Sequence, residues 1–503
     1  MLAQGGNAVD ACIAAAAVSW VAESPLTGPG GGGFMLVHRA RDHTSRVLDF
    51  FVSLPGKDLK RHSSQGMEEI DVEYDRDASQ IFKIGAASCA VPGTVAGLAA
   101  AHRAYGTVAW AELLQPAIAL ARDGVELTRT QGYLHAILDL ILRHSPEGRA
   151  VYGPNGSRLV AGERVVMSDL AASLELLAAE GAKALYQGEL GRALVRHVRD
   201  GGGEITRADL ESYRVVTRRP VRVPFRGREF VSNPPPSSGG VLIGYGLCLL
   251  DGLGPRGKAG SAEAIAALVE VMREQTRARG GRFTSDLYRG GLVRRLYSDE
   301  NVRTALERIQ TRERSQVEPA GAPGTTHISV VDGRGNAASL TASNGSGSGV
   351  IVADTGIHLN NMLGEYDLNP ARGGVQPGRR LTSMMAPSIV LEEGRPRLVV
   401  GSAGSVRLRG AILQIVVNVL EHGLAVEEAI GAPRVHLEEP HVHCEGGTDP
   451  AELDRLESWG YELIRWRRRN LYFGGASGVE LRDDGTLAAA GDPRRGGHGA
   501  VVE

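Results

Sequence analysis

The sequence predicts an α+β protein, and three observations lead to this fold class. Residues 7–23 are rich in alanine and nearly all apolar, which predicts a buried helix. Residues 34–38 are apolar and strand-like. Residues 327–331 and 337–343 predict two more strands, because a turn of the type Asp-Gly-Arg-Gly-Asn separates them.

Composition limits the classes of partner. The chain has 503 residues, of which 42% are hydrophobic and 23% charged, as in ordinary globular proteins. Its formal net charge of -2 provides no general attraction to nucleic acid or to an anionic membrane. Apolar runs such as 11–21 are shorter than the ~20 residues that span a bilayer. We therefore expect neither nucleic acid nor a membrane as a partner.

The first helix and the glycines after it come next along the chain. Asn7 is placed to cap the helix, which must end before Pro25. Residues 28–33 formally match the dinucleotide pattern GxGxxG, and Asp49 lies about 20 residues further on. However, these glycines follow a helix and precede a strand, which is the reverse of the dinucleotide-binding order. Close backbone packing is the better interpretation.

Further helices are predicted up to residue 420. A helix over 112–123 ends at Gly124, another begins near Thr206, and others cover 241–250 and 406–420. Residues 261–310 are helical and rich in arginine, but interspersed acids indicate a solvated face. Residues 57–78 are charged and predict a surface excursion without a motif.

The cysteines and histidines do not form a recognisable metal or disulfide pattern. Cys12, Cys89, Cys248 and Cys444 are widely spaced without a CxxC, so we expect buried free thiols. His441, His443 and Glu445 alternate along one face, but no further ligand follows at a recognisable spacing. We expect no metal and no cofactor.

The hairpin at 327–343 begins abruptly. Residues 314–324 are polar and contain proline and glycine, which predicts an exposed linker. Thr325 follows at once. Taken alone, it is a threonine that opens a strand.

Several motifs together change this interpretation. They are Gly30 to Phe34, Pro92 to Gly97, Asn233-Pro-Pro-Pro-Ser-Ser-Gly-Gly240, Thr325-Thr-His-Ile-Ser-Val-Val-Asp332, Leu359-Asn-Asn-Met362, Arg380-Leu-Thr-Ser-Met384 and Gly401-Ser-Ala-Gly-Ser405. In this order they resemble the gamma-glutamyltranspeptidases, a family of N-terminal nucleophile hydrolases. The resemblance runs from residue 4 to the C-terminus. It implies a four-layer αββα sandwich and self-cleavage between Gly324 and Thr325, into a large subunit 1–324 and a small subunit 325–503 that interleave in one fold.

The chemistry of a threonine at a new chain terminus explains this cleavage site. A threonine hydroxyl is a poor nucleophile without an adjacent base. The freed α-amine of Thr325, with an ordinary pKa near ~7.7–8.0, can accept the hydroxyl proton directly or through water. Gly324 suits the leaving side because it has no Cβ to hinder attack on its carbonyl.

The resemblance also implies the remaining site residues. Ser343 corresponds to a hydroxyl that touches the nucleophile, and Asn344 and Glu365 to groups that hold the donor. The hydroxyls of Thr382 and Ser383 match a pair that holds the donor carboxylate, with ordinary turn residues as an equal alternative. The backbone N–H groups of Gly404 and Ser405, at a strand-to-helix turn, are expected to form the oxyanion hole.

Two positions depart from the family pattern. Phe51 stands where the family has an arginine that pairs with the α-carboxylate of the donor, and Met362 replaces a polar residue. A carboxylate that is desolvated without a cation is destabilised by several kcal/mol.

The sequence therefore leaves three functions open. The first is hydrolysis or transfer of γ-glutamyl groups from small amides such as glutathione, with water or an amine or peptide as acceptor. The second is an amidase for another small acyl amide, glutaryl- or oxamate-like, as Phe51 suggests. The third is an uncleaved binding protein.

Location is the last expectation. No signal-peptide pattern precedes Gly5-Gly6-Asn7, which favours a cytoplasmic protein as the sequence stands. Family members carry a strand and half a helix before this point, so an upstream start and export remain open.

Overall fold

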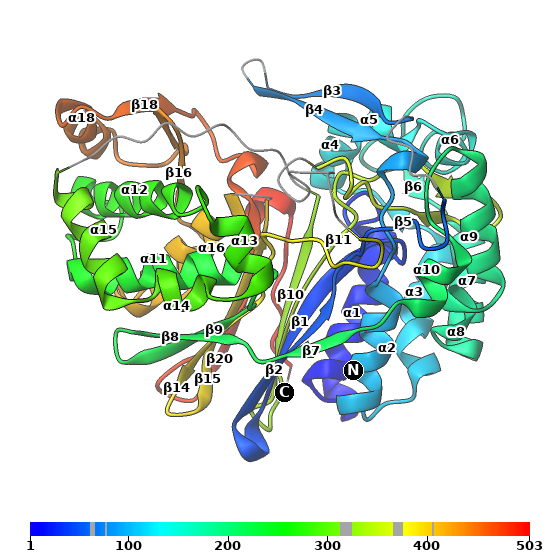
Figure 1. The fold of residues 1–503 in the computed structure, drawn as a ribbon, viewed down its shortest axis with the longest axis horizontal. Coiled ribbons are helices and arrows are strands. Elements are labelled where there is room, and N and C mark those ends of the chain that lie inside the picture. The colour runs from blue at the N-terminus through cyan, green and yellow to red at the C-terminus, as the bar shows by residue number, and fades with distance from the viewer. Residues whose placement is uncertain (61–65, 76–77, 312–323, 366–375, 405–406, 503) are drawn as a thin grey trace.

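Two β-sheets face each other between two layers of helices in the computed structural model, which describes residues 1–60, 66–75, 78–311, 324–365, 376–404 and 407–502. Figure 1 shows the sheets in the centre, with helices on both sides. This arrangement confirms the predicted αββα sandwich.

The first sheet has five antiparallel strands in the order β10-β11-β1-β2-β7. Its strands are β1 Gly32–Arg39, β2 Thr44–Phe50, β7 Val216–Arg218, β10 Thr326–Val331 and β11 Ala337–Ser343. Strand β11 pairs with β1, so a strand from the C-terminal third of the chain lies beside one from the N-terminus. The two segments 1–324 and 325–503 therefore share one sheet.

The second sheet has six antiparallel strands in the order β20-β19-β15-β14-β9-β8. Its strands are β8 Val221–Phe225, β9 Arg228–Ser232, β14 Ser388–Glu392, β15 Arg395–Ala403, β19 Gly475–Leu481 and β20 Leu487–Gly491. Strand β10, at the edge of the first sheet, packs against β15 and β19. It thus lies where the two sheets meet.

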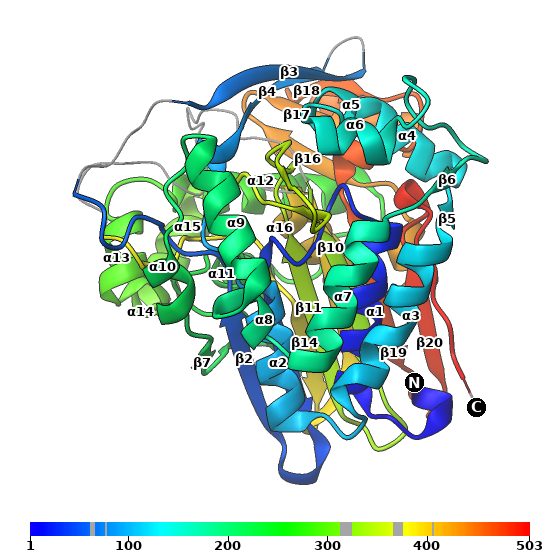
Figure 2. The ribbon, with the colours of Figure 1, turned by 90° about the vertical axis from the view of Figure 1, so that its right-hand side faces the viewer.

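Helices cover the outer face of each sheet (Figure 1), and Figure 2 shows the first helix layer from its outer side. On the first sheet lie α1 Ala8–Ala22 and α2 Thr94–Tyr105, with α3 Trp110–Asp123 packed on α1 and α7 Ser168–Glu180 packed on α3. On the second sheet lie α11 Gly239–Leu253 and α16 Arg407–Leu420, and α12 Ala262–Arg277 packs on α11. The other helices are α4 Arg129–Ile137, α5 Asp139–Leu142, α6 Pro146–Tyr152, α8 Lys183–Tyr186, α9 Glu189–Asp200, α10 Arg207–Ser212, α13 Phe283–Arg289, α14 Leu292–Leu296, α15 Asp299–Thr311, α17 Val426–Gly431 and α18 Pro450–Ser458.

Smaller sheets and short 3-10 helices complete the fold. The sheets are β3 Glu68–Asp75 with β4 Ala78–Ile84, β5 Val125–Glu126 with β6 Arg164–Val165, β12 Ile351–Val352 with β13 Ile357–His358, and β16 Val435–Glu438, β17 His441–Cys444 and β18 Glu462–Arg465. The 3-10 helices are η1 Leu2–Gln4, η2 Ala40–Asp42, η3 Ala86–Ser88, η4 Leu471–Phe473 and η5 Pro493–Arg495.

The alternation of side chains in β1 builds two cores. Met35 and Val37 are buried against the helices of the first layer, whereas Phe34 and Leu36 are buried between the sheets. This follows from the two-residue period of a strand. A strand buried on both faces is apolar throughout, which is why residues 34–38 read as a continuous apolar run.

Most local predictions are confirmed. Asn7 caps α1 with a capping box, since its side chain accepts from Asp10 N and Asp10 accepts from Asn7 N. Gly124 ends α3 with a φ of 81°. All four cysteines are free thiols, and Cys248 alone is only half-buried.

The sequence did not predict the hairpin of β3 and β4. The excursion at 57–78 leads into the hairpin of β3 and β4, which contains too many charged side chains for a strand pattern to show.

Two predictions fall outside the described residues. They are most of the linker at 314–324 and the donor role of Ser405. Within the described part of the chain, no helix is long and apolar enough to cross a membrane.

Candidate active site

Thr325 lies at the entry to β10, directly before the first residue of the strand. The pairing of Thr326 with Ala342 sets the register, which brings Thr325 next to Ser343 at the end of β11. Thr325 is 5% exposed, and its Oγ1 donates to Ser343 Oγ at 3.3 Å. The predicted nucleophile and the predicted hydroxyl partner are therefore in contact.

The hydroxyl of Ser343 joins three groups. Its Oγ donates to the carbonyl oxygen of Gly324 and accepts from Gly345 N at 2.8 Å, besides accepting from Thr325. A serine hydroxyl has one proton and two lone pairs, so all of its capacity is used. The one proton points at the carbonyl of the bond that would be cut.

Gly324 is held against the loop after β11. A Cβ at this position would lie 1.5 Å from the carbonyl oxygen of Gly345, so no other residue fits without moving the backbone. The sequence predicts that the lack of a Cβ at Gly324 leaves its carbonyl open to attack. In the structure, the lack of a Cβ also allows the backbone of Gly324 to approach Gly345.

A contact that the sequence did not indicate comes from Arg495. Its Nη1 donates to the carbonyl oxygen of Thr325, across 170 residues of sequence. The arginine side chain lies on Gly475, where a Cβ would be 2.1 Å from Arg495 Cδ. No motif marks Arg495, because only the position of η5 beside β19 directs it to Thr325.

Asn344 and Glu365 lie on two loops that touch. Asn361 N donates to Asn344 O at 3.1 Å, and a Cβ on Gly345 would lie 2.7 Å from Glu365 Oε1. Asn344 is fully buried, its Nδ2 donates to His358 O at 3.4 Å, and its Oδ1 has no hydrogen-bond partner among the described residues.

The glycines at 28–33 pack directly on Asn344. A Cβ on Gly31 would lie 2.3 Å from Asn344 Oδ1, and one on Gly28 would lie 3.0 Å from Nδ2. This confirms the interpretation of these glycines as close backbone packing.

Thr382 and Ser383 are buried, and two stretches of backbone, at Gly32 and at Val52, lie between them and Ser343. Ser343 pairs with Gly32, Gly32 packs on Val52, and Val52 O accepts from Leu381 N at 3.1 Å. Thr382 Oγ1 has no hydrogen-bond partner within the described chain, and Ser383 Oγ accepts from Met385 N at 3.0 Å. Both hydroxyls thus keep a proton to donate.

The proline-rich turn at 234–238 donates hydrogen bonds to the backbone of Ser383. Ser237 Oγ and Ser238 N donate to Ser383 O at 3.0 and 2.8 Å. Residues 234–238 therefore fix the backbone of Ser383.

Gly404 occupies the turn between β15 and α16. Its φ of 130° lies in the region that favours glycine, and its carbonyl accepts from Arg407 N at 3.0 Å. The preceding residue, Ala403, pairs with Gly475, on which Arg495 lies. This turn and Thr325 are thus linked through one arginine.

Phe51 is fully buried in an apolar cluster between the sheets. Its ring stacks on Phe34 with centroids 5.5 Å apart, and Met362 belongs to the same cluster. The two departures from the family pattern therefore occur in one apolar region.

Arg380 is a cation beside this cluster, and its Nη atoms are already engaged. Its Nη atoms donate to the carbonyl oxygens of Phe51, Asp49 and Arg214 and to the hydroxyl of Tyr213, and its Nε lies 3.2 Å from Asp49 Oδ1. Arg380 cannot take over the role of a donor-binding arginine without giving up these contacts.

His327 is the histidine nearest to the nucleophile in sequence. Its Nδ1 shares a hydrogen bond with Thr341 Oγ1 at 2.8 Å and its Nε2 with Ser329 Oγ at 2.9 Å. Burial lowers the pKa of His327 to about 3. It remains neutral at ordinary pH with both ring nitrogens occupied, so it is not placed as a general base.

His441, His443 and Glu445, which alternate in and directly after β17, contact other side chains of the protein. Trp466 Nε1 donates to His443 Nδ1 at 3.1 Å, His441 lies 3.8 Å from Glu462, and Glu445 accepts from Arg494. In the described part of the chain, no group of three or more histidines, cysteines and acids could hold a metal ion.

The αββα sandwich and the threonine at the start of β10 define the N-terminal nucleophile class of hydrolase. The sequence profile described as Gamma-glutamyltranspeptidase matches residues 1–502. The chain belongs to the gamma-glutamyltranspeptidase family of N-terminal nucleophile hydrolases.

Individual relatives fall into two kinds. The chain is 36% identical to the acylase ACY 1 proenzyme of Pseudomonas sp. (strain SE83), over 97% of this chain and 88% of that protein. It is 31% identical to the glutathione hydrolase proenzyme of Escherichia coli (strain K12), over 98% of this chain and 87% of that protein. The crystal structure of a cephalosporin acylase from Bacillus halodurans has the same fold, with a TM-score of 0.85 and 24% identity over 100% of this chain and 92% of that one.

Proposed function

We propose that this protein is a self-processing amidase and acyltransferase that forms an acyl ester on Thr325. One observation carries the proposal: the Ser343 hydroxyl accepts from Thr325 Oγ1 and donates to Gly324 O. A single side chain thus contacts the attacking oxygen and polarises the carbonyl that it attacks. That is the arrangement an acyl shift requires.

The processing step follows from these contacts. Thr325 Oγ1 bonds to the carbonyl carbon of Gly324 while Ser343 Oγ keeps its hydrogen bond to the carbonyl oxygen, and the Thr325 hydroxyl proton passes to the departing nitrogen. The bond from Gly324 C to Thr325 N then breaks, which leaves an ester. Breaking this bond frees the Thr325 α-amine, and water then hydrolyses the ester to a Gly324 carboxylate and the Thr325 hydroxyl, giving chains 1–324 and 325–503.

Turnover of a substrate repeats the chemistry with the new α-amine as base. The amine removes the Thr325 hydroxyl proton, Oγ1 attacks the amide carbonyl, and the N–H groups of Gly404 and Ser405 hold the oxyanion. The amine half of the substrate leaves with a proton. Water or an amine then takes the acyl group in a ping-pong sequence.

The identity of the acyl group depends on Phe51 and Arg380. A γ-glutamyl group carries a carboxylate and an ammonium on one carbon. Asn344 and Glu365 suit the ammonium. Among the described residues that the resemblance assigns to the donor carboxylate, Thr382 and Ser383 offer neutral hydroxyls, Phe51 is apolar, and the Nη donors of the neighbouring Arg380 are engaged. We propose that the preferred acyl group lacks the α-carboxylate, and that γ-glutamyl amides react slowly.

Four anilides test this acyl preference. γ-Glutamyl, 4-aminobutyryl, glutaryl and butyryl anilides have both groups, the ammonium alone, the carboxylate alone, or neither. We expect kcat/KM for 4-aminobutyryl to equal or exceed that for γ-glutamyl, because the α-carboxylate is desolvated without a cation. A γ-glutamyl value ten times the 4-aminobutyryl value would instead establish a γ-glutamyl enzyme, as the name of the E. coli relative suggests.

Processing is tested separately on a denaturing gel. Wild-type protein should resolve into two pieces that correspond to 1–324 and 325–503, whereas Thr325→Ala should remain whole. If the wild-type chain stays intact after long incubation, the protein is an uncleaved binding relative.

A further inference from the structure

The short helix η5 is fixed on β19 by Asp492, its N-cap residue. Asp492 Oδ1 accepts from Arg494 N at 3.0 Å, and its Oδ2 accepts from Ala476 N at 2.9 Å. The two arginines of η5 leave this turn in different directions. Arg494 pairs with buried acids, whereas Arg495 Nη1 donates to the carbonyl oxygen of Thr325.

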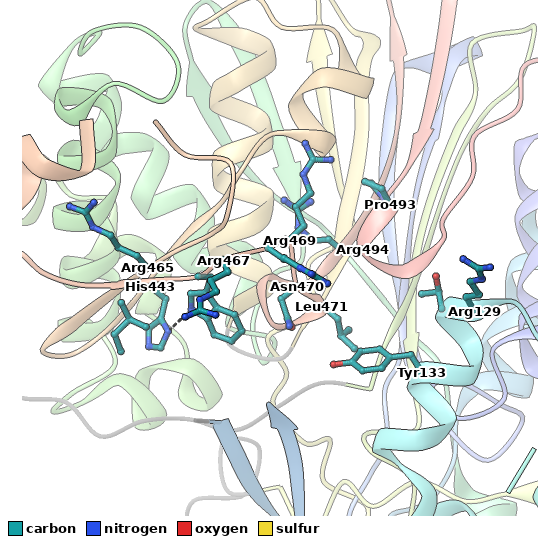
Figure 3. Close-up of a pocket in the computed structure, with 14 residues that line it drawn as sticks. Arg129, Tyr133, His443, Arg465, Arg467, Arg469, Asn470, Leu471, Pro493 and Arg494 are labelled. Atoms are coloured by element: carbon teal, nitrogen blue, oxygen red, sulfur yellow. Dashed lines mark hydrogen bonds between the residues drawn. The ribbon is translucent and has the colours of Figure 1, made fainter. Parts of the chain in front are cut away.

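A cavity of about 990 Å³ lies beside η5, between α4 and the segment 465–471. Figure 3 shows Pro493 and Arg494 of η5 between that segment and α4. Neither Thr325 nor Arg495 is among the described residues that line the cavity. Arg495, rather than the cavity, therefore joins this arginine-rich region to the nucleophile.

Self-cleavage would leave the atoms of this contact unchanged. The bond to be cut joins Gly324 C to Thr325 N, whereas Arg495 binds the carbonyl on the other side of Thr325. The N and O atoms of one residue are about 3 Å apart, and a hydrogen bond adds about 3 Å, so the guanidinium charge lies roughly 6 Å from the new α-amine. A positive charge at this distance disfavours the ammonium form.

Two acids act on the α-amine in the opposite direction. Glu23, directly after α1, accepts from Thr326 Oγ1, and a Cβ on Gly345 would lie 2.7 Å from Glu365 Oε1. Both carboxylates favour an ammonium at Thr325. An ammonium has no lone pair with which to accept the hydroxyl proton. The charge of a cation at Thr325 offsets these two acids.

The other charged groups around β10 act less on the α-amine. His327 is neutral because burial lowers its pKa to about 3. Arg407 begins α16, and its guanidinium lies over the ring of Tyr472, 4.2 Å from the centroid. The charged groups further along α1, β15 and β19 are roughly 15–25 Å along their elements from the ends next to Thr325. They are Asp10, Arg395, Arg397 and Glu480.

We propose that Arg495 is a positioning residue for the nucleophile: its guanidinium holds the carbonyl of Thr325, and its charge keeps the adjacent α-amine unprotonated near neutral pH. The inference rests on the proposed function, because the α-amine exists only in the cut chain. It adds to that function the group that sets the pH range of activity.

Substitution of Arg495 should move the pH limb of kcat/KM, measured on the best anilide of the four. Arg495→Gln removes the charge, and Coulomb's law at about 6 Å gives a rise of roughly 0.5–2 pH units in the pKa of the α-amine. Arg495→Lys keeps a positive charge and should shift the limb by less than about half as much. A merely structural role would lower the high-pH plateau and leave the limb where it is.

Arg334→Gln is the matched control. Arg334 is exposed in the turn of the same hairpin, about 20 Å from Thr325 along β10 and beyond the ~10 Å over which exposed charges act in 0.1 M salt. Its limb should coincide with that of wild type. Equal shifts in Arg495→Gln and Arg334→Gln, or no shift in Arg495→Gln, would overturn the proposal.

Direct titration of the α-amine gives a second measurement that needs no turnover. Trace acetylation with acetic anhydride from about pH 5.5 to about pH 9.5 reports the fraction of free amine, read by mass spectrometry on the peptide that begins with Thr325. In wild type the pKa should lie below the ordinary ~7.7–8.0. A value of about 8 or above overturns the proposal, even where Arg495→Gln is not cut.

The two measurements separate this inference from the proposed function. Hydrolysis of an anilide with an α-amine that Arg495→Gln does not shift refutes the role of Arg495 alone. An α-amine that is shifted as expected, without hydrolysis of any of the four anilides, refutes the amidase alone. A wild-type chain that stays whole refutes both.

Discussion

Replacement of Ser343 by alanine is the sharpest perturbation of the processing site. Ser343→Ala removes a side-chain donor to Gly324 O and the acceptor for Thr325 Oγ1 and Gly345 N. The hydrogen bonds that are lost in the uncut chain join neutral groups, so we expect the free energy of unfolding to fall by only about 1–2 kcal/mol.

The effect on the rate of self-cleavage should be larger. Negative charge develops on Gly324 O as Thr325 attacks, and loss of a donor to such an oxyanion costs about 10²–10³ in rate, or roughly 3–4 kcal/mol. Because the rate depends on the free-energy difference between the transition state and the uncut chain, this loss in rate itself measures the part of the Ser343 contribution that acts only in the transition state.

The assay is a pulse-chase. The protein is synthesised in a cell-free system, the label is chased, and the intact chain is followed on denaturing gels. Ser339→Ala is the matched control, because Ser339 is buried on the same strand and its Oγ has no hydrogen-bond partner among the described residues. The control should cleave at the wild-type rate. Cleavage of Ser343→Ala within threefold of wild type would refute the role given to this hydroxyl.

Three further predictions concern pH and the acyl site. The kcat/KM of the processed enzyme should rise with pH as the Thr325 α-amine loses its proton, and His327→Gln should keep this limb; its disappearance would make the histidine the base. Burial lowers the pKa of His38, His135 and His358 to about 4, as it lowers that of His327 to about 3, so the unfolded chain binds more protons. The free energy of unfolding should therefore be highest above pH 6.5, the ordinary pKa of about 6.5 that the histidines have in the unfolded chain. Below this pH it should fall by about 1.4 kcal/mol per pH unit for each histidine, until the pH reaches the pKa of that histidine in the folded protein. Equal urea midpoints at pH 7.5 and 5 would contradict this. Phe51→Arg should raise the ratio of γ-glutamyl to 4-aminobutyryl turnover about ten- to a hundredfold if the variant folds and cleaves itself, with Phe51→Leu as the control, and an unchanged ratio would show that position 51 does not face the donor.

Local patterns determined much of the fold. The run at 7–23 specified a buried helix because its apolar residues surround the whole helix, and Asn7 capped it because asparagine accepts from the first free N–H groups. The hairpin after Thr325 was readable because its turn residues and apolar strands lie next to each other in sequence. These features depend on neighbours a few residues away.

The contact of Thr325 with Ser343 was also within reach of the sequence. Both ends of a hairpin are fixed once its turn is fixed, since strand pairing proceeds one residue at a time. Only the family resemblance, however, indicated that the threonine at this position is a nucleophile. The hairpin β3–β4 was missed because its charged side chains conceal the two-residue period.

What the tertiary structure alone decided is which distant side chains meet. Arg495 reaches Thr325 O, Arg380 is occupied by Asp49 and backbone carbonyls, and Arg467 to Arg469 face α4 across a cavity. The sequence around an arginine does not show whether its side chain pairs with an acid, donates to buried carbonyl oxygens or lines a cavity. Its role depends on sheet register and helix packing over hundreds of residues, and periodicity carries no information about either.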